Sequence, residues 1–251
     1  MNIWKEAEPF DFAGSKEIGV LVIHGYTGST SGVLPWAQGM AEAGYTVTGP
    51  RLTAHGTQWQ DLNRMSWKDW VQDVETAYGD LKSRVTHVFV AGLSMGAALA
   101  VYLGEKHPEI SGLMMVNNLL LTGSPLVPLL PLIRHLTPSV PALANDIKDP
   151  TKTEIAYAVN PTGGSDEWRK LLGYIKPRLK DIHQPTIIFK SLEDHVIPKS
   201  SATYTFNKIS SEKKELVWLK NSYHVATMDF DLPLIVEKSL DFINRTVWEG
   251  K

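Results

Sequence analysis

Short apolar runs alternate with amphipathic stretches along most of the chain. Residues 19–23, 87–91 and 112–117 are apolar runs of strand length. Residues 33–43 and 67–83 carry apolar side chains at spacings of three and four, which is the period of a helix. Strands that alternate with helices favour right-handed βαβ units. The pattern therefore predicts an α/β protein with a mostly parallel central sheet flanked by helices.

The same alternation continues toward the C-terminus. Ser66 can cap the helix that follows it, and Gly44 suits the end of the preceding one. Further strands are expected at 45–48, 185–189 and 215–219, and further helices at 97–103, after Pro198 and at 232–247.

The alternation breaks between residues 119 and 176. Prolines interrupt this segment repeatedly, so no long regular element is expected there; they are Pro125, Pro128, Pro131, Pro138, Pro141, Pro150 and Pro161. We interpret 119–176 as a cap inserted into a core formed by residues 1–118 and 177–251. Its first part, 119–133, is very apolar, which suits either a pocket for an acyl chain or packing of the cap onto the sheet.

Composition excludes several classes of function. The formal net charge is −2 and no dense Lys/Arg cluster occurs, so nucleic acid is not an expected partner. The absence of cysteine excludes disulfides, thiolate zinc sites and a cysteine nucleophile. Residues 1–9 contain no apolar run of signal-peptide length, and no run of about 18 apolar residues occurs. A soluble, cytoplasmic protein is expected.

A nucleophile is indicated where the strand at 87–91 meets the next helix. The five residues from Gly92 to Gly96 match G-x-S-x-G, with Ser94 at the centre. A strand that turns directly into a helix forces its central residue into a strained conformation, and the flanking glycines leave room for close approach. The amide of Met95, at the start of the helix, can then donate to a developing oxyanion.

A second glycine-rich turn follows the strand at 19–23. Gly25 and Gly28 allow the backbone to turn tightly beside the nucleophile, and the Tyr26 amide is the expected second oxyanion donor. His24 stands at the end of the strand, and we interpret it as a structural residue that holds this loop, not as a catalytic base.

The order of a hydrolase triad on such a sheet is serine, acid, histidine. Asp194 follows the strand at 185–189 and is the expected acid, with Glu193 as the rival. His224 follows the strand at 215–219 and is the expected base, whereas His195 precedes that strand. The three residues predict hydrolysis of a carboxylic ester through an acyl-enzyme on Ser94.

The remaining histidines do not suggest a metal site. None has the short paired spacing of a zinc site, so neither a metal nor another cofactor is expected. His55, which precedes Gly56, is expected to line the entrance to the site. A non-catalytic binding module with the same fold is the alternative of a different class.

Five segments together resemble the bacterial monoacylglycerol lipases and the related small Bacillus-type carboxylesterases. They are residues 24–28, 50–57, 92–96, 193–196 and 221–225. The resemblance covers nearly the whole chain and is weakest at 119–140. It implies an α/β-hydrolase fold with a cap and a small ester or monoacylglycerol as substrate. A general carboxylesterase without preference for glycerol is the alternative, and transient contact with lipid aggregates is a further expectation.

The resemblance also implies roles for individual residues. It assigns Ser94, Asp194 and His224 to the triad. It further implies that a cap glutamate meets the glycerol hydroxyls, and Glu154 stands where that residue falls. The chain departs from the group at Tyr26, where Phe is more usual and which bears on the polarity of the pocket, and at Ala97, where Gly is common.

Overall fold

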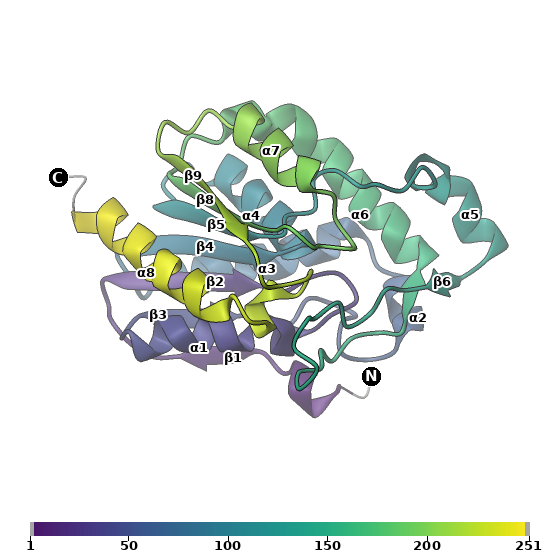
Figure 1. Ribbon diagram of the computed structural model, residues 1–251, viewed down its shortest axis with the longest axis horizontal. Helices are drawn as coiled ribbons and strands as arrows, with labels where there is room; N and C mark the ends of the chain where they lie inside the picture. The colour runs from purple at the N-terminus through teal and green to yellow at the C-terminus, as the bar shows by residue number, and fades with distance from the viewer. Residues whose placement is uncertain (1–2, 249–251) are drawn as a thin grey trace.

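The computed structural model describes residues 3–248, which form a central sheet of seven strands (Figure 1). The strand order is β1-β3-β2-β4-β5-β8-β9, and only β1 runs antiparallel to its neighbour. The strands are β1 (Phe10–Phe12), β2 (Ile18–Ile23), β3 (Thr46–Gly49), β4 (His87–Leu93), β5 (Gly112–Val116), β8 (Thr186–Ser191) and β9 (Lys214–Leu219). The expected mostly parallel sheet is confirmed.

Helices cover both faces of this sheet (Figure 1). One face carries α1 (Leu34–Glu42) and α8 (Leu232–Trp248), which pack against each other. The other face carries α3 (Trp67–Lys82), α4 (Met95–Lys106), α6 (Thr162–Ile175) and α7 (Lys199–Lys208). A short helix, α2 (Trp59–Leu62), precedes α3. Short 3₁₀ helices lie at Lys5–Ala7, Thr30–Gly32, Val127–Leu129, Lys176–Asp181 and Ala226–Met228.

Alternate residues of the buried strands supply the two halves of the core. In β2, Val20 and Val22 pack on the side of α1 and α8, and Leu21 and Ile23 pack on the opposite side. Because every residue of β2 is buried, the strand is apolar throughout and does not alternate with polar residues.

Local signals set the ends of the helices as the sequence predicts. Ser66 accepts a hydrogen bond from the Lys68 amide, and Asp69 accepts one from the Ser66 amide, so a capping box starts α3. Gly44 follows α1 with a φ of +92°, a conformation that a residue with a Cβ rarely adopts.

The expectation that residues 119–176 contain no long regular element is wrong. After α5 (Leu130–Leu136) and the antiparallel pair β6 (Ser139–Pro141) and β7 (Val159–Pro161), the 14-residue helix α6 begins. Pro161 caps α6 and no proline follows until after Ile175, so the prolines that interrupt the segment all precede this helix.

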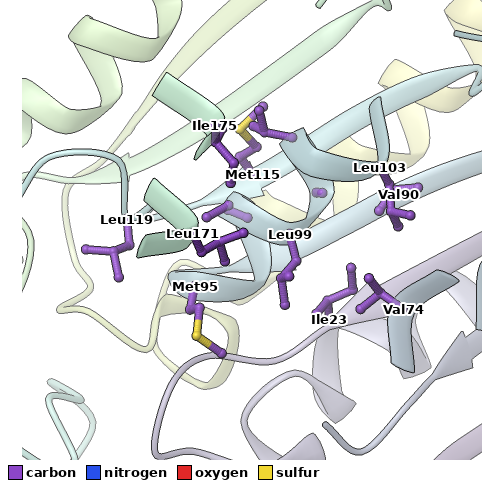
Figure 2. Packing of buried hydrophobic residues seen from close by; sticks show 14 of the residues in the cluster. Ile23, Val74, Val90, Met95, Leu99, Leu103, Met115, Leu119, Leu171 and Ile175 are labelled. Carbon is purple, nitrogen blue, oxygen red and sulfur yellow. The ribbon is translucent and has the colours of Figure 1, made fainter. Parts of the chain in front are cut away.

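Helix α6 packs against α3 and α4, the helices that cover this face of the sheet, and shares their apolar cluster. Figure 2 shows Leu171 and Ile175 of α6 in one cluster with Leu99 of α4 and Met115 of β5. We therefore propose to move the end of the cap from residue 176 to Pro161, and to treat 119–161 as the inserted part.

Parallel strands bring their carboxyl ends to one edge of the sheet. Ser94 follows β4, Asp194 lies three residues beyond β8, and His224 lies in the loop after β9. The fold thus places three distant segments at one edge. Within residues 3–248, none of the helices combines the length and hydropathy needed to span a bilayer.

Candidate active site

Ser94 stands at a strained turn between β4 and α4. Its backbone has φ +56° and ψ −113°, a conformation that non-glycine residues rarely adopt. A Cβ at Gly92 would overlap the backbone of Gly96, and a Cβ at Gly96 would overlap the carbonyl oxygen of Ile23. Both glycines are therefore required for the close approach of β4, α4 and β2 that holds Ser94 in this conformation.

The glycine loop after β2 lies directly beside Ser94. A Cβ at Gly25 would stand 3.4 Å from the Ser94 Cβ. Among the described residues, none accepts a hydrogen bond from the amides of Tyr26 and Met95. Two free backbone donors next to a serine hydroxyl suit the binding of an oxyanion, which is the role that the sequence predicts for them.

His224 and Asp194 form a hydrogen-bonded pair. The His224 Nδ1 lies 3.1 Å from each carboxylate oxygen of Asp194. The carboxylate also accepts from the amides of Val196 (2.9 Å) and Ile197 (2.8 Å). This arrangement fixes the ring with Nδ1 protonated, which leaves Nε2 free to take a proton.

Glu193 and His195, the alternatives to Asp194 and His224 in the sequence, each pair with another residue. Glu193 pairs with Lys148, 2.9 Å between Oε1 and Nζ. His195 pairs with Asp146, 2.8 Å between Nδ1 and Oδ1, and its side chain is half exposed. The geometry thus favours Asp194 over Glu193 as the partner of His224.

Two residues of this region were not anticipated. Lys190, the fifth residue of β8, is fully buried and its ammonium donates to Asp194. Asp146, from the inserted segment, accepts from the backbone amides of His195 (3.2 Å) and His224 (3.1 Å). A lysine directly after an apolar run was a detectable signal in the sequence, whereas nothing in the sequence singles out Asp146.

The charge on Asp194 is stabilised by its neighbours. Burial alone would raise its pKa, but the charge and hydrogen bond of His224, the charge of Lys190 and the Ile197 amide outweigh burial. The pKa of Asp194 is therefore held well below its usual range, and the carboxylate stays ionised.

A cavity of about 390 Å³ opens over Ser94 and His224. Its volume falls within the range of small-molecule sites. Gly25, Tyr26 and Val225 contribute to its wall. The inserted segment supplies apolar residues, Leu119, Leu126, Val127, Leu130, Ile133, Val140 and Leu143, and polar ones, Asn145, Asp146, Glu154 and Asn160.

Glu154 presents an unpaired carboxylate to this cavity. Its Oε1 would lie 2.5 Å from a Cβ at Gly28 and 2.9 Å from one at Gly32, so the carboxylate packs on the backbone beside the predicted oxyanion loop. No described residue hydrogen-bonds to or pairs with that carboxylate. Burial raises the pKa of Glu154 to about 7, and the charge of His224 offsets only part of this effect.

His24 holds the loop, as the sequence predicts. Its Nε2 accepts from the Leu52 amide (3.1 Å) and its Nδ1 donates to the Gly25 carbonyl (2.9 Å). Burial lowers its pKa to about 4, so the ring is neutral at neutral pH.

The prediction that His55 lines the entrance is wrong. His55 is fully buried and lies outside the cavity wall. Its ring centroid is 4.9 Å from that of His24 and 5.8 Å from that of Trp70. Gly56 turns the chain with a φ of +65°, and Nδ1 of His55 donates to the Thr53 carbonyl, so the ring points into the core. The pKa of His55 lies well below its usual range, mainly because the ring is buried and secondly because the charge of the nearby His24 opposes its protonation.

Tyr26 connects the glycine-rich loop after β2 to the inserted segment. Its hydroxyl donates to the Pro161 carbonyl at 2.7 Å. A tyrosine at this position, where the related enzymes more often have Phe, therefore adds a hydrogen bond to β7.

The profile of the family described as "Serine aminopeptidase, S33" matches residues 15–160, which is more than half of the chain. The chain belongs to this family. It is a serine hydrolase of the α/β-hydrolase superfamily, with the fold that the sequence predicts.

Relatives with assigned names align along nearly the whole chain. A thermostable monoacylglycerol lipase of Bacillus sp. (strain H-257) is 43% identical over 95% of each chain. A carboxylesterase of Bacillus subtilis (strain 168) is 26% identical, over 96% of this chain and 98% of the relative. A solved structure from work on the metagenome-derived lipolytic enzymes LipS and LipT has a TM-score of 0.93 and 39% identity, and covers 97% of this chain and 100% of its own. The resemblance stated from the sequence is confirmed.

Proposed function

We propose that the protein hydrolyses monoacylglycerols to a fatty acid and glycerol through an acyl-enzyme on Ser94. One observation carries the proposal: Ser94 and His224, the partner of Asp194, line a cavity to which the inserted segment adds a group of apolar side chains and the carboxylate of Glu154. An acyl chain suits the apolar residues, and glycerol hydroxyls suit a carboxylate that has no partner within residues 3–248.

These positions support an acyl-enzyme mechanism. His224 takes the proton of the Ser94 hydroxyl as Oγ attacks the ester carbonyl, and Asp194 stabilises the imidazolium. The amides of Tyr26 and Met95 bind the oxyanion. The tetrahedral intermediate collapses, the C–O bond to glycerol breaks, and His224 protonates the departing oxygen. Water then gives its proton to His224 and attacks the acyl carbon, and the fatty acid leaves as the proton returns to Ser94.

The substrate is tested by matched esters of one acid. We expect a higher kcat/KM for 1-monolauroylglycerol than for ethyl laurate or trilauroylglycerol, and a series from C4 to C18 monoacylglycerols gives the acyl-length optimum. Equal rates on the glyceryl and ethyl esters would favour a general carboxylesterase.

The role of Ser94 is tested separately. Ser94→Ala is expected to lower kcat by on the order of 10⁶. A fluorophosphonate is expected to label Ser94 in the wild-type protein and to leave the variant unlabelled. Near-normal hydrolysis by folded Ser94→Ala protein would contradict the assignment.

Contact with lipid aggregates forms a finer part of the proposal. Leu132 and Leu136 of α5 are 66% and 85% exposed and lie outside the cavity wall. Leu126, Leu129 and Leu143 add exposed apolar surface to the inserted segment, and Leu126 and Leu143 also line the cavity. A Leu132→Ser/Leu136→Ser variant should hydrolyse a dissolved butyrate ester at the wild-type rate and emulsified monoolein more slowly. Equal loss on both substrates would refute this. A cytoplasmic location stays a prediction.

A further inference from the structure

A lysine ammonium lies beneath the carboxylate of Asp194. Lys190 has no exposed side-chain area, and it belongs to a strand whose six residues are all buried. Its ammonium donates to Asp194 Oδ2 and to the carbonyl oxygen of Ile197 (2.8 Å). An apolar side chain of the same volume would fill this space without the large desolvation cost of a buried charge.

The carboxylate has enough donors without this lysine. Oδ1 accepts from the amides of Val196 and Ile197, and His224 Nδ1 lies within bonding distance of both oxygens. Three donors already orient Asp194. What Lys190 adds is a full positive charge on the side of the carboxylate, and that charge opposes the attraction between Asp194 and a protonated His224.

Other charged groups face this cluster and must be considered with it. Burial lowers the pKa of Lys190, but the charge and hydrogen bond of Asp194, and then the charge of Asp146, act to keep it protonated. Lys199, at the exposed start of α7, acts in the opposite direction. The charged or titratable groups near His224 include Asp146, Glu154, His195, the Glu193–Lys148 pair, and Asp229, which accepts from the Tyr223 amide.

We propose that Lys190 acts through Asp194: its positive charge offsets part of the charge of the carboxylate, so that His224 remains an unprotonated base at lower pH. The inference rests on the proposed function, since it concerns the same triad. It predicts that loss of the lysine charge makes His224 easier to protonate. The acid limb of the pH–rate profile then moves to higher pH, by about one unit, which is roughly a tenfold change in proton affinity.

The test compares neutral replacements of Lys190. Lys190→Met has a similar volume and no charge, and Lys190→Gln keeps a donor for Asp194 without the charge. The kcat/KM of a dissolved butyrate ester is measured from pH 4.5 to 9. All variants carry Glu154→Gln, because the carboxylate of Glu154 titrates near neutrality and would obscure the limb. Lys199→Met is the matched control, since it removes a nearby but exposed charge.

We expect both replacements to raise the midpoint of the acid limb, while the control leaves it in place. Lys190→Met should also lower kcat at constant KM, and Lys190→Gln should recover part of that loss. The proposal is overturned if the midpoint of the acid limb stays within about 0.2 pH units of its value in Glu154→Gln protein that keeps Lys190, even if kcat falls. If both replacements unfold, Lys190 serves the fold instead, and the proposal is equally wrong.

A second readout is independent of catalysis. The His224 ring is titrated by NMR in Ser94→Ala protein, with and without Lys190→Met. An upward shift of the ring's midpoint supports the role of Lys190 even if the wild-type protein hydrolyses none of the proposed esters. An unmoved midpoint alongside normal hydrolysis refutes the role of Lys190 and leaves the proposed function intact.

Discussion

Replacing Glu154 by Gln is expected to stabilise the fold and, at the same time, to weaken the binding of a glyceryl ester. The carboxylate has no partner among the described residues, and its pKa rises from an ordinary 4.5 to about 7 because the site is buried. Between these values the unfolded chain loses a proton that the folded protein keeps. The free energy of unfolding therefore falls as pH rises from about 4.5 to 7, and the full penalty is present above pH 7.

The size of this effect follows from the two pKa values. At 1.36 kcal/mol per unit, the difference corresponds to about 3 kcal/mol. Solvent that reaches the carboxylate through the cavity screens part of it, so we expect Glu154→Gln to stabilise the protein by about 1–2 kcal/mol at pH 8. At pH 4 the group is neutral in both states and the variant should match the wild type.

The same variant should be a poorer enzyme for a glyceryl ester. A hydrogen bond between a charged group and a substrate hydroxyl contributes about 1.5–3 kcal/mol, so kcat/KM for 1-monolauroylglycerol should fall by roughly tenfold or more. The rate on ethyl laurate, which has no such hydroxyls, should change much less. Urea unfolding at pH 4, 6 and 8 and the two rate measurements form one experiment. A stability difference that does not vary with pH would refute the account of the raised pKa, and equal losses on both esters would refute the contact with glycerol.

Three further substitutions test the geometry of the site. Gly96→Ala should abolish most activity and destabilise the protein by about 2–4 kcal/mol, as thermal unfolding would reveal, because a Cβ there overlaps the backbone of β2; normal activity would contradict the close approach. Asp146→Asn weakens an acceptor of the His224 amide, so kcat should fall with little change in KM; an unchanged kcat would show that this anchor is dispensable. Tyr26→Phe removes the bond to Pro161 and should cost about 1 kcal/mol in urea unfolding while hydrolysis of butyrate esters persists; inactivation would implicate the hydroxyl in catalysis.

The turn around Ser94 could be predicted because its determinants are local. Two glycines, a central serine, an apolar strand before them and a helix after them all lie within about twenty residues, and each constrains the same backbone. The pairing of Asp194 with His224 could be predicted from chain order and from the shared edge of parallel strands, without any knowledge of distances.

Other features depended on contacts that the sequence does not encode locally. Lys190 follows an apolar run and resembles a residue at the exposed end of a strand. In the fold its whole strand is buried, and its ammonium is held by Asp194 and the Ile197 carbonyl. His55 packs against His24 and Trp70, which lie 31 and 15 residues away in the chain, so its burial depends on contacts that local sequence does not show. Helix α6 was missed because the density of prolines before it obscured a segment without any.

Asp146 binds the backbone of His224, while Tyr26 and the carbonyl of Thr27 bind Pro161 and the Tyr157 amide. These bonds tie the rear of the inserted segment to the same loops that hold the reactive groups. A substitution that loosens this segment at Asp146 or Tyr26 is therefore expected to displace the reactive groups as well as the wall of the cavity.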